Sequence, residues 1–109
     1  MRTIRLPYGK EFIEKEVDDK VFVLESAAHT YKAAKSQEDL VRDALENPID
    51  SEKLRDLAKG KKRITLITSD HTRPVPSAIT LPILLEEIRK GNPDADITIL
   101  IATGFHRPT

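Results

Sequence analysis

The sequence lacks cysteine, an excess of charge of either sign, and any long apolar run. Without cysteine the chain can form neither a disulfide nor a thiolate metal site. Its 18 basic residues balance its 18 acidic residues, so no overall positive field favours nucleic acid. The N-terminus has no apolar signal region, and no apolar run approaches the length of a membrane span. We therefore expect a cytoplasmic protein that binds neither nucleic acid nor a membrane.

What remains is the composition of a soluble globular domain. Hydrophobic residues make up 39% and charged residues 33% of the 109 positions, a balance typical of folded chains. A chain of this length is sufficient for one domain with one core. We therefore predict that residues 1–109 form a single domain.

The first part of the chain predicts a small β-layer over residues 3–25. The strand-like runs are TIRL, EFIEKEV and KVFVLE, and a turn is predicted at residues 7–9. Residues 26–35 show no clear period and predict a linker, with His29 as a surface loop histidine.

Two helices are predicted next. Ser36 is a good N-cap for the first, and Asn47-Pro48 ends it, because the residue before proline disfavours helical backbone. Asp50 or Ser51 is expected to cap a second, short helix that ends at Gly60.

The second half of the chain reads as strand, helix, strand. Residues 63–69 and 96–102 are apolar runs that fit strands buried on both faces, and residues 79–88 carry a helical apolar stripe. Such a βαβ unit makes the two strands parallel. The predicted fold class is therefore α/β, with a parallel-sheet βαβ core, flanking helices and a small N-terminal β-layer.

Polar residues follow both predicted strands. SDHTRPVP follows the first strand, and TGFHRPT follows the second. Ligands of open α/β sheets bind beyond the carboxyl ends of the strands, which parallel strands present at one edge. We therefore expect Asp70, Thr72 and Arg73 to face the same crevice as His106 and Arg107.

These residue types suit a small anionic substrate. The arginines Arg73 and Arg107 each offer a planar fork to a carboxylate. His106 can exchange a proton with a hydroxyl near neutral pH, and Gly104 allows a ligand to approach the backbone closely.

The same residues also have a purely structural interpretation. Arg73 can simply pair with Asp70 across a tight loop, Thr72 can be a turn residue, and His106 can be an ordinary loop histidine. For His71, at a strand end, we expect a side chain that points away from the crevice.

Beyond these single residues, the chain resembles a known family. The stretches SDHTRPVPSAITLPILLEEI and DITILIATGFHRPT resemble the N-terminal region of the nickel-dependent lactate racemase family. The upstream IRLPYGK and ALENPIDSEKLRDLAKG are also similar, so the resemblance spans essentially the whole chain.

The resemblance implies an enzyme that interconverts D- and L-2-hydroxy acids with a nickel pincer nucleotide. His106 matches an acid/base histidine, Arg73 matches the arginine that orients the substrate carboxylate, and Asp70 matches an acidic residue beside substrate and cofactor. Thr72, Gly104 and Arg107 are possible supporting residues. The family's cofactor lysine, nickel-ligating histidine and second acid/base histidine lie further along than Thr109, so no metal ligand is assigned here.

We therefore expect a truncated N-terminal part of a larger two-domain enzyme, whose missing C-terminal portion is its partner. Alone it is expected to bind no cofactor, to be inactive, and to expose the apolar residues Ile97, Ile99 and Ile101 of the second strand in a way that favours self-association. The alternatives are a racemase or epimerase of another 2-hydroxy acid, or a complete small anion-binding or interaction module.

Overall fold

The computed structural model describes residues 1–18 and 20–108, which form two compact units. The first unit runs from Met1 to Lys32 and the second begins at Ala33, and each is described by itself. The single domain expected from the sequence stays a prediction. Within the described residues no helix has both the length and the apolar character needed to span a membrane.

The first unit contains a β-hairpin. Strands β1 (Arg2–Tyr8) and β2 (Glu11–Val17) pair antiparallel, with Tyr8 opposite Glu11. The turn lies at Gly9 and Lys10 rather than at the predicted residues 7–9, because Pro7 is part of β1. Gly9 has a φ of 62°, which glycine adopts without steric cost.

The predicted third strand of this layer is wrong. Residues 21–26 are neither strand nor helix, and the side chains of Phe22 and Leu24 are 92% and 96% exposed. A strand requires a neighbour to take its backbone hydrogen bonds, and the described residues supply none here. The linker that follows contains a short 3-10 helix, η1 (Ala27–Thr30), capped by the Ser26 hydroxyl and carrying the exposed His29.

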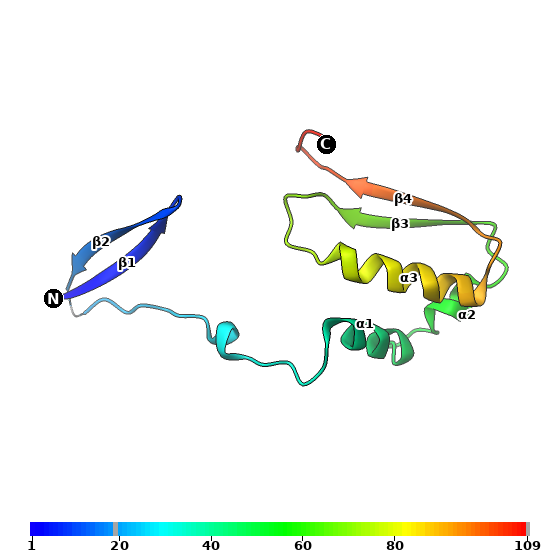
Figure 1. Ribbon diagram of the computed structural model, residues 1–109, viewed down its shortest axis with the longest axis horizontal. Helices are drawn as coiled ribbons and strands as arrows, with labels where there is room; N and C mark the ends of the chain where they lie inside the picture. The colour runs from blue at the N-terminus through cyan, green and yellow to red at the C-terminus, as the bar shows by residue number, and fades with distance from the viewer. Residues whose placement is uncertain (19, 109) are drawn as a thin grey trace. The chain divides into compact units, whose positions relative to one another are not determined.

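The second unit contains the predicted α/β core. Strands β3 (Arg63–Ser69) and β4 (Asp96–Ala102) are joined by helix α3 (Ser77–Gly91). The strands pair in parallel, as predicted, with Ser69 beside Ala102 at their carboxyl ends. Figure 1 shows α3 running alongside β3, with α1 on the side of α3 away from the strands.

The two preceding helices differ in how they begin. Helix α1 (Gln37–Glu46) starts as predicted, because the Ser36 hydroxyl accepts a hydrogen bond from the Asp39 amide at 3.1 Å. Helix α2 (Leu54–Ala58) follows Lys53, without a side-chain cap, so the predicted cap at Asp50 or Ser51 is wrong. Asp50 adopts left-handed backbone with a φ of 48°, whereas an N-cap is extended.

Helix α3 supplies the two largest buried apolar side chains among the described residues, Ile83 and Ile88. It begins at Ser77, two residues before the predicted start, and continues through Pro82 to Gly91. Ile88 is fully buried and Ile83 is 6% exposed, and Ala58 of α2 is 3% exposed. The core therefore lies around α3, between the sheet and the helices α1 and α2.

One face of the sheet is open, which corrects the prediction of strands buried on both faces. Along β3, Ile64 and Leu66 are half-buried, while Ile67 on the opposite face is 71% exposed. On β4, Leu100 lies beside Ile67 on the open face and is 52% exposed. Ile97, Ile99 and Ile101 lie on the other face, with Ile64 and Leu66; Ile99 and Ile101 are exposed there as predicted, whereas Ile97 is half-buried. Parallel sheets normally have both faces covered, so the face that carries Ile67 lacks its cover among the described residues.

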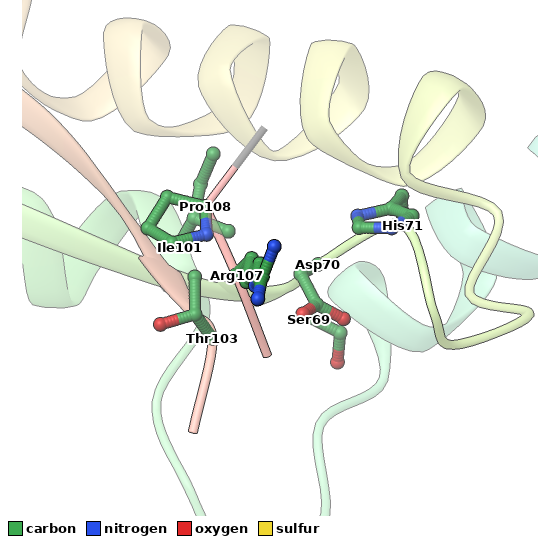
Figure 2. A pocket seen from close by; sticks show the side chains of 7 residues that line it. All are labelled: Ser69, Asp70, His71, Ile101, Thr103, Arg107 and Pro108. Carbon is green, nitrogen blue, oxygen red and sulfur yellow. The ribbon is translucent and has the colours of Figure 1, made fainter. Parts of the chain in front are cut away.

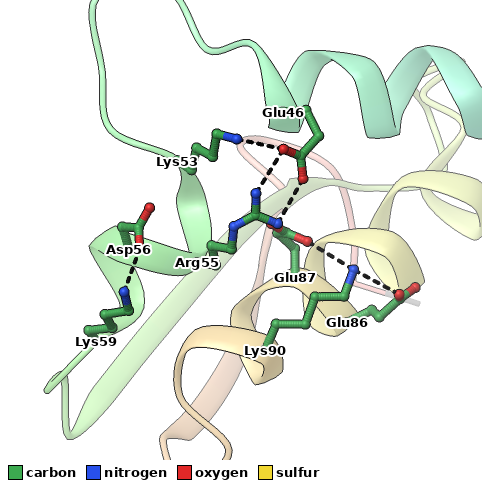
Figure 3. Close-up of polar contacts among 8 residues, drawn as sticks. All are labelled: Glu46, Lys53, Arg55, Asp56, Lys59, Glu86, Glu87 and Lys90. Carbon is green, nitrogen blue, oxygen red and sulfur yellow. Dashed lines mark hydrogen bonds and ion pairs between the residues drawn. The ribbon is translucent and has the colours of Figure 1, made fainter.

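Ion pairs connect the three helices (Figure 3). Glu46 of α1 accepts hydrogen bonds from Arg55 at 2.7 Å and from Lys53 at 2.6 Å. The Arg55 hydrogen bond, followed by that of Lys53, lowers the pKa of Glu46 to about 2. Arg55 also lies 3.1 Å from the buried carboxylate of Glu87, which pairs in turn with Lys90 at 3.2 Å. Because Glu87 is 4% exposed, these cations compensate a charge held out of water.

The end of α3 is pressed against α2. A Cβ on Gly91 would lie 1.8 Å from the backbone oxygen of Arg55, so only glycine fits there. The side-chain amide of the next residue, Asn92, donates to the carbonyls of Ala58 and Lys61 at 2.8 and 2.7 Å. These contacts join the end of α2 and the turn before β3 to the end of α3.

The substitution Gly91→Ala is expected to destabilise the protein by roughly 1–3 kcal/mol, because the backbone of α2 must move to admit the methyl group. Chemical denaturation measures this change. The control is Gly9→Ala, where an added Cβ has no atom within 4 Å and the cost comes from a φ of 62° alone. Equal stability of Gly91→Ala and the unsubstituted protein would contradict the close approach of α3 to α2.

Candidate functional site

A cavity of about 560 Å³ lies at the carboxyl ends of β3 and β4 (Figure 2). Its lining comes from the end of each strand and from the loop that follows it. The lining residues are Ser69, Asp70, His71, Ile101, Thr103, Arg107 and Pro108. The edge of the sheet predicted to hold a ligand therefore does carry a hollow with polar and charged walls.

Beside this cavity the two loops are joined by a hydrogen-bonded cluster of Asp70, Thr72 and His106. The His106 Nδ1 lies 2.6 Å from one carboxylate oxygen of Asp70 and 3.1 Å from the Thr72 hydroxyl. The Thr72 hydroxyl lies 2.6 Å from the other carboxylate oxygen of Asp70. Residues 36 positions apart in sequence thus meet, as the parallel pairing predicts.

Tight turns hold the members of this cluster in place. After β3, the Thr72 amide donates to the Asp70 carboxylate at 3.1 Å, and the Arg73 amide donates to the Asp70 carbonyl at 3.3 Å. After β4, the His106 amide donates to the Thr103 carbonyl at 2.9 Å. Gly104 lies inside this second turn with a φ of 56°, which explains why the turn contains glycine.

The electrostatic consequence is clearest at Asp70. The hydrogen bond from the Thr72 hydroxyl, with further ones from His106 and the Thr72 amide, lowers the pKa of Asp70 to about 2. The Asp70 side chain is only 5% exposed, whereas that of His106 is 37% exposed. The carboxylate is therefore charged at neutral pH and forms the inner end of the cluster, while the imidazole forms its outer end.

The remaining predicted residues are placed less uniformly. Asp70 and Arg107 line the cavity as expected, but Thr72, Arg73 and His106 are not among its lining residues. Within residues 1–18 and 20–108, the Arg73 side chain forms no hydrogen bond or ion pair and is exposed. The structural interpretation that pairs its guanidinium with Asp70 is therefore not what the structure contains.

His71 is the residue that sequence reasoning missed. We expected it to point away, yet its side chain lines the cavity on the side of the β3 loop (Figure 2). The alternation of side chains along a strand ends at Ser69, and a turn then decides the direction of each following side chain. The Asp-x-Thr spacing, which favours a turn closed by the Asp side chain, was the available signal.

The fold is that of an α/β domain, whose polar residues gather at the carboxyl edge of a parallel βαβ unit, the edge at which ligands of such sheets bind. The chain belongs to the lactate racemase N-terminal domain family, whose model matches residues 8–109.

Individual relatives agree with this assignment over the whole chain. The chain is 57% identical over 111 aligned positions to a lactate racemase of Thermoanaerobacterium thermosaccharolyticum, covering 100% of this chain and 26% of the relative. It is 51% identical to a lactate racemase of Lactiplantibacillus plantarum, again with 100% and 26% coverage. The chain thus spans about a quarter of the length of the curated relatives it matches.

A solved structure is similar as well. The structure of the lactate racemase apoprotein from Thermoanaerobacterium thermosaccharolyticum matches with a TM-score of 0.80 and 51% sequence identity. The match covers 99% of this chain and 25% of that one. The α/β fold predicted from the sequence is therefore confirmed.

The substitution Thr72→Val should raise the pKa of Asp70 from about 2 toward its ordinary value of 3.8, because it removes the largest cause of the shift. Carbon-13 NMR of the aspartate carboxyls during an acid titration measures this change. Thr98→Val, at an exposed position of β4, is the control and should leave that titration unaltered.

The same shift makes stability depend on pH. Because the pKa of Asp70 is lower in the folded chain than its ordinary 3.8, the ionised group stabilises the fold above about pH 4. This contribution is lost as the pH falls toward 2, so the stability difference between the unsubstituted protein and Thr72→Val should shrink over that range. A difference that stays constant down to pH 2 would contradict the role of Thr72.

Proposed function

We propose that the intact protein, meaning the full-length protein to which this chain belongs, interconverts the D- and L-forms of a 2-hydroxy acid. Lactate is the substrate that the names of its relatives indicate. Two observations together support the proposal. The chain is 57% identical to a lactate racemase over its whole length, and its His106 sits on a charged Asp70 beside the cavity.

In this proposal His106 exchanges a proton with the substrate hydroxyl. Its imidazole is about one-third exposed, so a substrate can reach it. Arg73 holds the substrate carboxylate through its planar guanidinium. Among the described residues this guanidinium has no other hydrogen-bond or ion-pair partner. Arg107 adds positive charge to the cavity wall, and Gly104 keeps the second loop in its turn.

The cofactor we propose is the nickel pincer nucleotide that the family resemblance implies. The Ser69 hydroxyl and the Arg107 guanidinium in the cavity wall fit an anionic nucleotide, since both can donate hydrogen bonds to a phosphate. Among the described residues no three His, Cys, Asp or Glu side chains form a group that could hold a metal ion. By the family resemblance, we assign the nickel ligand, the cofactor lysine and the second acid/base histidine to the rest of the intact protein. When bound, such a cofactor supplies acceptance and return of the substrate's α-hydride.

The open face of the sheet fits a longer protein. Ile67 and Leu100 are neighbours in the β3–β4 register and are 71% and 52% exposed. Since a parallel sheet is ordinarily covered on both sides, we propose that the remaining part of the intact protein packs against this face. The 109-residue chain alone would instead bury this face by self-association.

Replacing His106 by Ala in the intact protein is expected to slow interconversion of D- and L-lactate by roughly a hundredfold or more, because general acid/base help is lost. The change in thermal stability should be small, since the side chain is partly exposed. His29→Ala is the matched control, because this exposed histidine belongs to the other unit. A His106→Ala protein with unchanged turnover would overturn the proposed role. An intact protein that interconverts none of a panel of 2-hydroxy acids would overturn the function.

The companion substitution Arg73→Lys keeps the positive charge but loses the planar fork. We expect the main effect on KM, with a smaller effect on kcat, in the same assay. An unchanged KM would remove Arg73 from the substrate-binding residues.

Ile67→Lys tests the proposed cover of the sheet. In the intact protein this substitution should cost about 1–3 kcal/mol, because it places a charge under the covering part. The control Ile49→Lys alters an isoleucine that is 92% exposed outside the sheet, and surface changes usually stay within about 0.5 kcal/mol. Denaturant melts in which both proteins are equally stable would show that the face stays open.

A further inference from the structure

We infer that Asp70 and Thr72 act together as positioning residues, which hold the neutral His106 ring with its proton on Nδ1 and its free lone pair on Nε2. The hydrogen bonds of the cluster carry this inference. Its catalytic consequence rests on the proposed function, whereas the tautomer itself can be measured without substrate. The inference also assigns Asp70 to His106 rather than to the substrate.

The contact between Asp70 and His106 needs a proton that only His106 can supply. A carboxylate that is charged at neutral pH has no hydrogen to give, so the short contact of 2.6 Å between Asp70 and His106 requires a proton on Nδ1. A ring with its lone pair on Nδ1 would instead face the negative oxygen directly. The contact therefore selects one of the two neutral tautomers.

The Thr72 hydroxyl has one proton and two neighbours. The nearer neighbour is the Asp70 oxygen at 2.6 Å, and the farther one is His106 Nδ1 at 3.1 Å. With the proton directed to the carboxylate, the Thr72 oxygen becomes a second acceptor for the Nδ1 proton. Both contacts of Nδ1 then favour the same tautomer.

The hydrogen bonds of the cluster leave Nε2 of His106, rather than Asp70, available to a ligand. One Asp70 oxygen accepts from the Thr72 hydroxyl and the Thr72 amide, and the other accepts from His106. With its side chain only 5% exposed, Asp70 has little left to offer a substrate. Nε2 lies across the ring from Nδ1, on the more exposed side chain of the pair, and is the atom that can take a proton from a hydroxyl.

The same contacts predict that Asp70→Asn changes the tautomer of His106. The two donors of Thr72 retain the amide oxygen of Asn at the position of the oxygen they now bond. The amide NH₂ must then occupy the other position, where it donates toward Nδ1 of His106. Nδ1 becomes an acceptor, and the ring proton moves to Nε2.

The experiment labels the histidine rings of the intact protein with nitrogen-15 and records two-bond proton–nitrogen correlations at a pH where the rings are neutral. The His106 signals are assigned by their loss in His106→Gln. We expect protonated Nδ1 in the unsubstituted protein and protonated Nε2 in Asp70→Asn. Thr72→Ser, which keeps the hydroxyl, serves as the control and should retain protonated Nδ1.

A double substitution separates positioning from general disturbance of the loop. In Asp70→Asn with Thr72→Val the amide loses the hydroxyl donor that orients it, so part of the Nδ1-protonated form should return. A protein whose Asp70 served only structure would show no such rescue.

Two outcomes overturn the inference independently. One is protonated Nε2 in the unsubstituted protein. This measurement can be made even if Asp70→Asn fails to fold. The other is a folded Asp70→Asn protein that retains protonated Nδ1.

Activity distinguishes this inference from the proposed function. If the intact protein is a racemase, Asp70→Asn should lower kcat by about a hundredfold or more with little change in KM. A loss confined to KM would return Asp70 to the substrate-binding residues and overturn the positioning role. An intact protein with the expected tautomers but no racemase activity would overturn the function and leave the positioning pair in place.

Discussion

The parallel pairing of β3 with β4 is the constraint on which the candidate site depends. Because the strands run in the same direction, with Ser69 beside Ala102, the loops that follow them leave the sheet at one edge. An antiparallel pair would send the two loops to opposite edges and separate Asp70 from His106 by the length of a strand. Helix α3 makes the pairing possible, since parallel neighbours need a crossover connection.

The two ends of α3 perform different tasks. Its first residue, Ser77, follows directly on the loop that contains Asp70, Thr72 and Arg73. Its last turns carry Glu87, Lys90 and Gly91, which contact α2. A helix of 15 residues is about 22 Å long, so the contacts that fix its C-terminal end lie far from the cavity. The contacts that join α3 to α2 and the residues of the candidate site therefore lie on separate parts of the chain.

Much of the fold could be predicted from the sequence, because its strongest signals are local. The apolar runs of β3 and β4 and the Ser36 cap of α1 all predicted the elements that form. The residues of KVFVLE were mistaken for a strand, since β-propensity describes a residue's fit to a sheet and cannot supply the neighbouring strand.

The site was predictable in outline and not in detail. Topology alone brought Asp70, Thr72 and His106 to one edge of the sheet. It could not assign the Asp70–His106 hydrogen bond or the direction of His71, which depend on turns after the strands have ended. Those turns are made by the Asp70 side chain and by Gly104. The directions of the neighbouring side chains depend on the backbone path of each turn.

We propose that the imidazole of His106, held by Asp70, faces the substrate with Nε2 in the intact protein. A crystal structure of the intact protein with a bound 2-hydroxy acid would test it most directly. We expect the substrate hydroxyl within about 3 Å of Nε2, with the Asp70 carboxylate still hydrogen-bonded to Nδ1. A substrate bound directly to Asp70, with the His106 ring turned away from it, would contradict the account.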